Sequence, residues 1–419
     1  MKDLRVALVV PDQKLPTAAK RRWMDALHAA CRSSEVDLVV FPESYEDAAL
    51  DSAIAVARTL ADDFNVPVLA GVETHEGFQT AAYFNPNPFS GETASHLYIK
   101  HSSAAHLAFE RRNYRGRRDP MFKPICLGGQ RLGVMICHDM FYGLITDIYL
   151  EKEATGLFDL TGGDVRLAKW RNIVQGRSIE LGGPFFCTMA RGENVRAQAG
   201  AIAFRNGLEQ KPITSHLGPE GTGGFAIFPL SPGAGKEARL ESSDRFSSHE
   251  QYKDIRVSLG GRGFAHVAIS VSSGKAKVEG QASTGLEQRW HGFKLPAGHT
   301  GVLCLPLKEL WSPRRLYEMF PSDGAFAHHI VVYFATETPA DPERVLALAR
   351  LRAIEHRIAV GILAGGMREM LKTNTWKSIQ RFRPNGDVFG LDARNLRGTR
   401  SACAAGISVN LIDAYLELV

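Results

Sequence analysis

Three short apolar segments of this chain each end in a side chain that can take part in chemistry. Residues 39–44 read Val-Val-Phe-Pro-Glu-Ser, residues 97–100 read Leu-Tyr-Ile-Lys, and residues 134–139 read Val-Met-Ile-Cys-His-Asp. Each segment has the composition of a buried strand, and the last residues supply Glu43, Lys100 and Cys137 in turn. Since α/β proteins place their sites at the ends of such strands, we expect the three side chains to converge at one edge.

A carboxylate, an ammonium and a thiol together suit the hydrolysis of an amide, whose carbon is a poor electrophile. The thiolate of Cys137 would attack first, and water would then release the acyl product. Glu43 is the candidate base that takes the thiol proton and returns it to the leaving nitrogen. Lys100 and the backbone N–H of His138 would stabilise the oxyanion, and the charge of Lys100 is expected to lower the pKa of the Cys137 thiol.

Each of these residues also has an ordinary structural explanation. A lone cysteine that closes an apolar strand is usually a small core residue. A glutamate after a proline is favoured at the N-terminus of a helix by the helix dipole. A lysine at the end of a strand usually lies in solvent. The occurrence of all three, in order and each at a strand end, favours the catalytic interpretation.

The order Glu43, Lys100, Cys137 resembles the nitrilase, or carbon–nitrogen hydrolase, superfamily over about residues 1–275. The resemblance implies a four-layer αββα sandwich and an enzyme without metal or other cofactor. Residues 106–116 are similar to the family's loop in carbamoyl-amino-acid and amide hydrolases, so Glu110 would be a second catalytic carboxylate that positions Lys100. A surface glutamate that neutralises neighbouring arginines is the alternative. Asp139 and Glu180 also resemble family features, and we expect both to be structural.

Two segments depart from the family pattern and leave the substrate open. Residues 140–143 read Met-Phe-Tyr-Gly where the family has Pro-Glu, and residues 159–163 read Asp-Leu-Thr-Gly-Gly where it has a segment with Asn or Pro. Arg111 and Arg112 suit an acidic substrate, because guanidinium groups bind carboxylates at two points. A solvated basic loop or an oligomer contact explains these arginines equally well. We expect a small amide or N-carbamoyl substrate, with a nitrile as the other choice.

Alternating strand and helix patterns surround these segments and predict a layered α/β fold. The expected strands are 6–10, 36–41, 66–71, 96–99, 132–137, 157–160 and 185–189, and the expected helices are 17–33, 48–64, 144–152 and 170–180. Residues 231–262 are rich in Ser, Gly and charge, which predicts a loop, and 264–271 reads as a strand that would close the first sandwich.

From residue 298 the pattern of the first half begins again. Strands are expected at 301–306, 329–337 and 361–365, with a helix at 344–354. We interpret residues 298–419 as a smaller α/β unit, a partial and degenerate copy with Ile412 in place of Cys137, and expect it to be inactive. Such a copy must bury its open face, either on residues 1–275 or against another chain in a homo-oligomer.

Composition narrows the class of protein. Of 419 residues 44% are apolar and 23% are charged, which allows large cores and excludes a disordered chain. The net charge of +5 does not indicate nucleic-acid binding. The six cysteines form no C-x-x-C pair, which argues against a disulfide framework or zinc and suits the cytoplasm. No segment is long enough for a signal sequence or a membrane span. The alternative to an enzyme is a non-catalytic sensor or interaction protein that keeps the same pocket.

Overall fold

The structure is a computed structural model that separates into two compact units, Met1–Arg239 and Leu240–Val419. It describes residues 4–103, 108–109, 122–162, 167–190, 199–231, 255–261, 264–272, 275–279, 301–306, 310–311, 330–336, 342–356, 359–364, 379–382 and 414–418. The division falls inside the segment predicted as a loop, 231–262. The domain boundaries at 275 and 298 stay predictions.

The first unit contains two β-sheets. The larger one has the strand order β15-β16-β1-β2-β4-β5-β6, with β3 paired to β4. Its strands are β1 Leu4–Val10, β2 Leu38–Val40, β3 Glu46–Ala48, β4 Val68–Thr74, β5 Gln79–Phe84, β6 Ser95–Ile99, β15 Thr214–Ser215 and β16 Gly224–Leu230. Strands β1, β2 and β4 are parallel, as the predicted βα alternation requires, and β5 and β6 follow as an antiparallel meander.

The second sheet of this unit has the order β14-β13-β12-β11-β10-β9. It consists of β9 Ile125–Leu127, β10 Gln130–Ile136, β11 Gly156–Thr161, β12 Pro184–Met189, β13 Gly200–Arg205 and β14 Leu208–Glu209. Here β10, β11 and β12 are parallel and almost wholly buried, because helices cover one face and the other sheet covers the other. A short ribbon, β7 Ser102–Ser103 with β8 Ala108–Phe109, lies outside both sheets.

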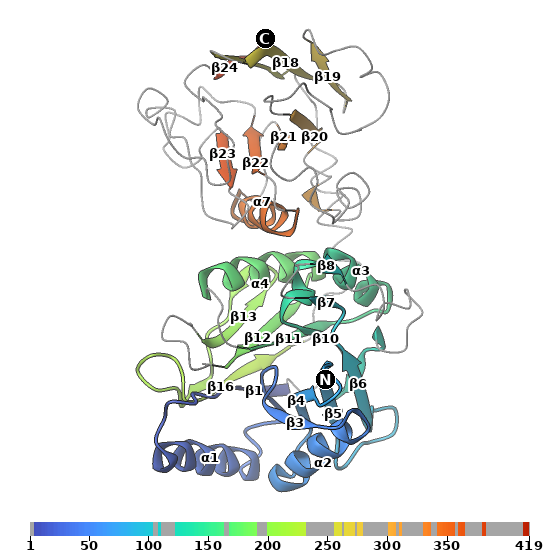
Figure 1. Ribbon diagram of the computed structural model, residues 1–419, viewed down its shortest axis with the longest axis vertical. Coiled ribbons are helices and arrows are strands. Elements are labelled where there is room, and N and C mark those ends of the chain that lie inside the picture. The colour runs from blue at the N-terminus through green and yellow to red at the C-terminus, as the bar shows by residue number, and fades with distance from the viewer. Residues whose placement is uncertain are drawn as a thin grey trace. The chain divides into compact units, whose positions relative to one another are not determined.

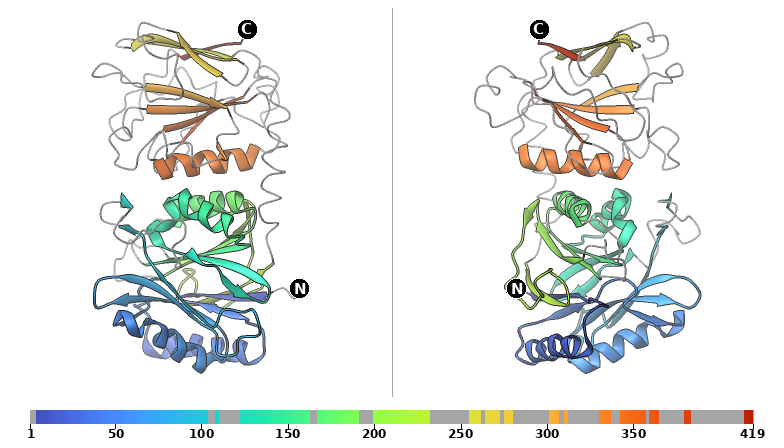
Figure 2. Two further views of the ribbon diagram at one scale, coloured as in Figure 1. Left: turned by 90° about the vertical axis from the view of Figure 1, so that its right-hand side faces the viewer. Right: turned by 60° about the vertical axis from the view of Figure 1, so that its left-hand side comes forward.

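Helices cover the two outer faces, so the unit is the four-layer αββα sandwich expected (Figures 1 and 2). The first sheet carries α1 Thr17–Arg32, the one-turn helix η1 Leu50–Ser52 and α2 Ala53–Phe64; the second carries η3 Cys137–Phe141, α3 Gly143–Glu151 and α4 Leu167–Leu181. Contacts between the sheets include the hydroxyl of Thr188, which donates to the carbonyl of Val9, and the edge-on packing of Phe186 on Phe228.

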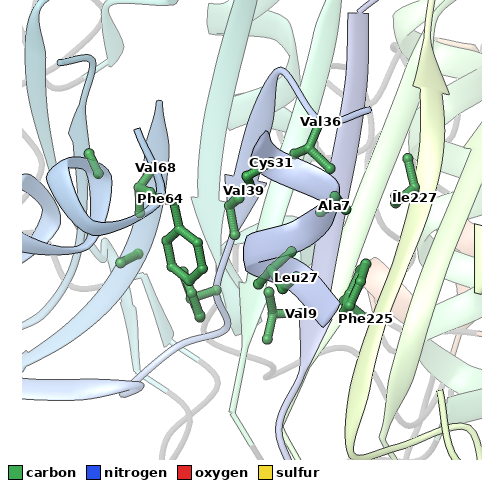
Figure 3. Close-up of a cluster of buried hydrophobic side chains, with 14 of the residues drawn as sticks. Ala7, Val9, Leu27, Cys31, Val36, Val39, Phe64, Val68, Phe225 and Ile227 are labelled. Carbon is green, nitrogen blue, oxygen red and sulfur yellow. The ribbon is translucent and has the colours of Figure 1, made fainter. Parts of the chain in front are cut away.

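The core under α1 shows why the alternating pattern folds this way. Trp23, Leu27 and Cys31 recur at helical spacing on α1 and are buried. They pack on β-branched and aromatic residues of the first sheet (Figure 3), including Val9, Val39, Val68, Phe225 and Ile227. The helix and the strands therefore bury the apolar faces that their sequences supply.

Three sequence predictions about elements were wrong. The helix expected from Ala48 begins only at Ala53, because Glu46–Ala48 pairs with β4 as an extra strand. The first sandwich is closed by β16, which pairs with β1 along seven residues, and not by residues 264–271, which belong to the second unit. The loop expected at 231–262 includes a strand, β17 Ile255–Gly261, because β18 supplies it with a hairpin partner.

The second unit contains two further sheets. One, ordered β19-β18-β17-β24, comprises β17, β18 Phe264–Ser272, β19 Lys275–Glu279 and β24 Ala414–Leu418. The other, ordered β20-β21-β22-β23, comprises β20 Gly301–Pro306, β21 Ile330–Thr336, β22 Ala359–Ala364 and β23 Ile379–Phe382. Helix α7 Pro342–His356 lies along one face of the sheet formed by β20 to β23 (Figure 2). The strands and the helix predicted over 301–365 are present, whereas Ile412 lies outside the described residues.

Within the described residues, no helix has the length and apolar character needed to cross a membrane.

Candidate active site

Glu43 lies in the turn that follows β2, and it is buried with 5% exposure. The turn passes close to β4, where a Cβ on Gly71 would lie 2.2 Å from the carbonyl oxygen of Pro42 and 2.5 Å from Cα of Glu43. Only glycine fits at that position. Ser44 has a φ of 52°, so the chain turns away immediately after the glutamate. Backbone packing therefore fixes the place from which the carboxylate extends.

Both oxygens of the Glu43 carboxylate accept hydrogen bonds. Lys100, the residue after β6, donates from Nζ to Glu43 Oε1 at 2.6 Å and to Gln79 Oε1 at 2.6 Å. The backbone N–H of Gly162, after β11, donates to Glu43 Oε2 at 2.8 Å. The side chains of Lys100 and Glu43 are only 4% and 6% exposed. Burial lowers the pKa of Lys100. The negative charge that Cys137 carries when it is ionised and the charge of Glu43 together outweigh burial, so the pKa of Lys100 is raised and its ammonium group stays protonated.

Cys137 follows β10 in a strained turn. Its φ of 52° lies in the left-handed region that residues other than glycine rarely adopt, and it begins the short helix η3. The residue is 6% exposed, and its Sγ lies 3.2 Å from Nδ1 of His138. Strain of this kind is typical of residues whose orientation matters for function.

The electrostatics of Cys137 agree with the expected effect of Lys100, but a larger effect opposes it. Burial raises the pKa of the thiol well above its ordinary value, and the charge of Glu43 raises it further. Lys100 does lower the pKa, as expected, but it does not reverse the direction. Sequence reasoning weighed the nearby cation and missed the cost of placing a thiolate in a dry site. The resting group is therefore a thiol that needs a base.

Asp139 ties the lysine segment to the cysteine turn. Its carboxylate accepts from the Tyr98 hydroxyl at 2.8 Å, from the backbone N–H of His101 at 3.1 Å and from that of Ile136 at 3.3 Å. One end of the bridge is the end of β6, and the other is the end of β10. Asp139 thus has the structural role that was expected of it.

Arg177 and Glu180 brace the same turn from α4. Arg177 donates from Nη1 to Glu180 Oε2 at 2.6 Å and from Nε to the carbonyl of Met140 at 2.8 Å, and both side chains are fully buried. Met140 lies within η3, three residues after Cys137. The expected role of Glu180 inside the fold is confirmed, with Arg177 as the partner that sequence reasoning did not name.

A second buried carboxyl group, Asp159 on β11, was missed from the sequence. Its Oδ2 accepts from Thr161 Oγ1 at 2.5 Å and from Cys187 Sγ at 3.4 Å, and Trp170 Nε1 donates to Thr161 Oγ1 at 2.9 Å. Burial raises the pKa of Asp159 well above its ordinary value, and the charge of Glu43 acts in the same direction. The available signal was a lone carboxylate within the apolar strand Gly156–Thr161.

The structure brings Glu43, Lys100, Cys137 and His138 together. Glu110, Arg111 and Arg112 lie outside the described residues, so their assigned roles stay predictions. Across the described part of the chain, His, Cys, Asp and Glu side chains form no group of three that could hold a metal ion.

Comparisons with known proteins give matches only among solved structures. No protein-family model matches the chain, and no curated protein matches it. The chain is similar to a carbon–nitrogen hydrolase from Helicobacter pylori G27, with 17% identity over 60% of this chain and 95% of that one and a TM-score of 0.42.

Two further solved structures show a similar degree of likeness. A mutant of the amidase from Nesterenkonia sp. AN1, which carries the acetamide moiety of fluoroacetamide on its active-site cysteine, is 16% identical over 59% of this chain and 96% of that one, with a TM-score of 0.42. XC1258 from Xanthomonas campestris, a CN-hydrolase superfamily protein with an arsenic adduct in its active site, is 18% identical over 59% and 96%, with a TM-score of 0.40. Likeness of this degree does not extend to activity, so the function is argued from this chain's own residues.

Proposed function

We propose that this chain is a cysteine-dependent hydrolase of carbon–nitrogen bonds other than peptide bonds, acting on a small amide or N-carbamoyl compound. The observation that carries the proposal is the buried ion pair of Lys100 and Glu43, at 2.6 Å, beside the strained Cys137. Burying two charges costs several kcal/mol per ion unless they are paired and hydrogen-bonded. A buried ion pair beside a nucleophilic side chain is more typical of a catalytic site than of a structural core.

The first half of the reaction follows from the arrangement. Glu43 takes the proton from the Cys137 thiol while sulfur forms a bond to the substrate carbon. Negative charge then develops on the carbonyl oxygen, where Nζ of Lys100 and the backbone N–H of His138 stabilise it. The carbon–nitrogen bond breaks as Glu43 returns the proton to the leaving nitrogen, and a thioester is left on Cys137.

The second half reuses the same groups. A water molecule attacks the thioester carbon while Glu43 accepts its proton, and the same oxyanion contacts form again. The carbon–sulfur bond breaks, the acid product leaves and sulfur regains its proton from Glu43. The hydrogen bond from Gly162 to Glu43 keeps the carboxylate in one orientation through both steps.

Ammonia release tests the proposal directly. The panel contains small aliphatic amides, N-carbamoyl amino acids and nitriles, and Cys137→Ala is the matched control. We expect release from an amide or a carbamoyl compound by the natural chain only. Preference for an acidic carbamoyl compound would support the predicted roles of Arg111 and Arg112. No release from any member of the panel would contradict the proposal.

The burial of the thiol favours a second candidate, a non-catalytic sensor built on the same site. Cys137 is 6% exposed and its pKa is raised by burial, which are properties of an inert core cysteine. Iodoacetamide labelling followed by mass spectrometry separates the two. A hydrolase should label at Cys137 before the other thiols, whereas slower labelling than at Cys126, which is less buried, would support the sensor.

A further inference from the structure

Two side chains near the Cys137 thiol can accept its proton, and the proposed mechanism uses only one of them. Glu43 is the first, and its carboxylate already accepts from Lys100 and from Gly162. The second is Nδ1 of His138, 3.2 Å from Sγ. That contact joins adjacent residues across the turn in which Cys137 has its unusual φ of 52°. The turn therefore holds an imidazole against the nucleophile.

Aromatic packing fixes the orientation of the His138 ring. Phe141 stacks on it with 5.0 Å between centroids and 14° between planes, and Trp170 approaches edge-on at 5.5 Å and 84°. Phe141 belongs to η3 and Trp170 to α4, so two separate elements restrain the ring. A side chain positioned this way needs little reorganisation to act.

We propose that His138 is a catalytic residue of this site, taking the Cys137 proton on Nδ1 while Glu43 stays paired with Lys100. This inference rests on the proposed function and gives the two proton transfers of the first half-reaction to the imidazole in place of Glu43. The S–H bond breaks as an N–H bond forms at Nδ1 and sulfur bonds to the substrate carbon. The imidazolium then gives that proton to the leaving nitrogen as the carbon–nitrogen bond breaks, which leaves Glu43 to activate water in the second step.

The division of work fits the charges around the pair. Among the described residues, Glu43, Lys100 and Asp159 act on Cys137 through their charges. Asp139 accepts from the backbone N–H of Ile136, just before the turn. Lys169 lies over the ring of Phe141, with Nζ 4.5 Å from the centroid. In the tautomer with its proton on Nε2, a neutral imidazole accepts from the thiol and separates no charge until attack begins.

The test is the pH dependence of iodoacetamide alkylation at Cys137, measured by mass spectrometry on the full chain. In the natural chain the alkylation rate should rise with pH along a limb that the loss of the His138 imidazolium proton produces. His138→Gln should remove this limb and slow alkylation at pH 7.5 by about 100-fold, the lower end of what a positioned base contributes. His138→Phe, which keeps an aromatic ring in the stack, should behave like His138→Gln.

His28→Gln is the control, because His28 lies on α1 and pairs with Asp63; its profile should match that of the natural chain. Superimposable profiles for the natural chain and His138→Gln would overturn the inference and leave both transfers to Glu43. The outcome is separable from the proposed function. Ammonia release with an alkylation profile independent of His138 defeats only this inference. His138-dependent alkylation without ammonia release defeats the hydrolase and leaves His138 only as the base for the thiol.

Discussion

The layer that carries Cys137 and the layer formed by β20 to β23 are built alike. In each, three parallel strands are followed by an antiparallel fourth, β10 to β13 in one and β20 to β23 in the other. In each, a helix between the second and third strands carries a buried Arg–Glu pair three residues apart, Arg177–Glu180 in α4 and Arg352–Glu355 in α7. The arginine Nε donates to a backbone carbonyl in both, that of Met140 and that of Leu310.

This match differs from the copy predicted from the sequence, in which Ile412 takes the place of Cys137. Strand directions alone fit either half of the first unit, since β1, β2, β4 and β5 have them too. Helix α2, however, has Ala61 three residues after Arg58, where α4 and α7 have glutamate. Both acceptor carbonyls lie four residues past the end of the strand, so the position equivalent to Cys137 is Leu307. The layer of β20 to β23 therefore keeps the Arg–Glu pair but has leucine in the place of the cysteine.

The Arg–Glu pair therefore stabilises the fold of both layers, whereas the chemistry depends on the turn that follows β10. Substitution of Cys137 in that turn should have the largest effect. Cys137→Ala should reduce turnover to background, a loss on the order of a million-fold, because removing a nucleophile disables the whole constellation. Cys304→Ala, in β20, should leave turnover unchanged. A large loss from Cys304→Ala would place chemistry in the second layer and break the comparison.

Lys100→Met tests the buried ion pair of Lys100 and Glu43, which a layer without chemistry would not need. The substitution leaves Glu43 buried without its cation, so unfolding free energy should fall by about 3–5 kcal/mol. Loss of one oxyanion donor should lower kcat by about 100- to 1000-fold. Chemical denaturation and steady-state kinetics measure the two effects. A stable variant with unchanged kcat would show that Lys100 serves neither purpose.

Arg177→Met and Arg352→Met separate architecture from chemistry most sharply. Each removes the arginine of a buried ion pair, so each should cost about 3–5 kcal/mol of stability in denaturation experiments. Only Arg177→Met should also lower kcat, because Arg177 holds Met140 in the turn of Cys137. Equal effects of the two substitutions on kcat, measured below the denaturation midpoints, would contradict this account.

Gly162→Ala should give the smallest effect. Gly162 is the residue after β11, the second strand of its layer. The corresponding position in the other layer, after β21, is Glu337. A Cβ at Gly162 would lie 3.1 Å from Glu43 Oε2, so the carboxylate must shift by a few tenths of an ångström. We expect kcat to fall about tenfold with little loss of stability. Gly200→Ala, whose Cβ would meet Leu167 at 3.5 Å, is the matched control and should leave kcat unchanged.

Much of the fold was predictable because the buried strands and helices have the periodicity of their elements. The expected strand 6–10 and helix 17–33 agree with β1 and α1 to within two residues at each end. Strand β16 was missed because its antiparallel partner, β1, is distant in the sequence, which a local pattern does not reveal. Strand β5, which forms a hairpin with β4, was missed because its sequence Gln-Thr-Ala-Ala-Tyr-Phe has few β-branched residues.

The site was predictable in part for a related reason. Glu43, Lys100 and Cys137 lie at strand ends, so their convergence follows from topology. The imidazole contact of His138 and the hydrogen bond from Gly162 depend on side-chain and backbone geometry in turns. The contacts of the Asp159 carboxyl on β11 depend on the neighbouring strand and helix. The direction of the thiol pKa also depended on burial, which three-dimensional packing decides.

Mass spectrometry of the chain quenched in acid during turnover can detect the covalent intermediate itself. With a substrate found in the ammonia-release panel, we expect a thioester: an added acyl mass on Cys137 that hydroxylamine removes and that Cys137→Ala lacks. Continued ammonia release by Cys137→Ala, or an acyl mass on a different cysteine during turnover, would contradict this expectation.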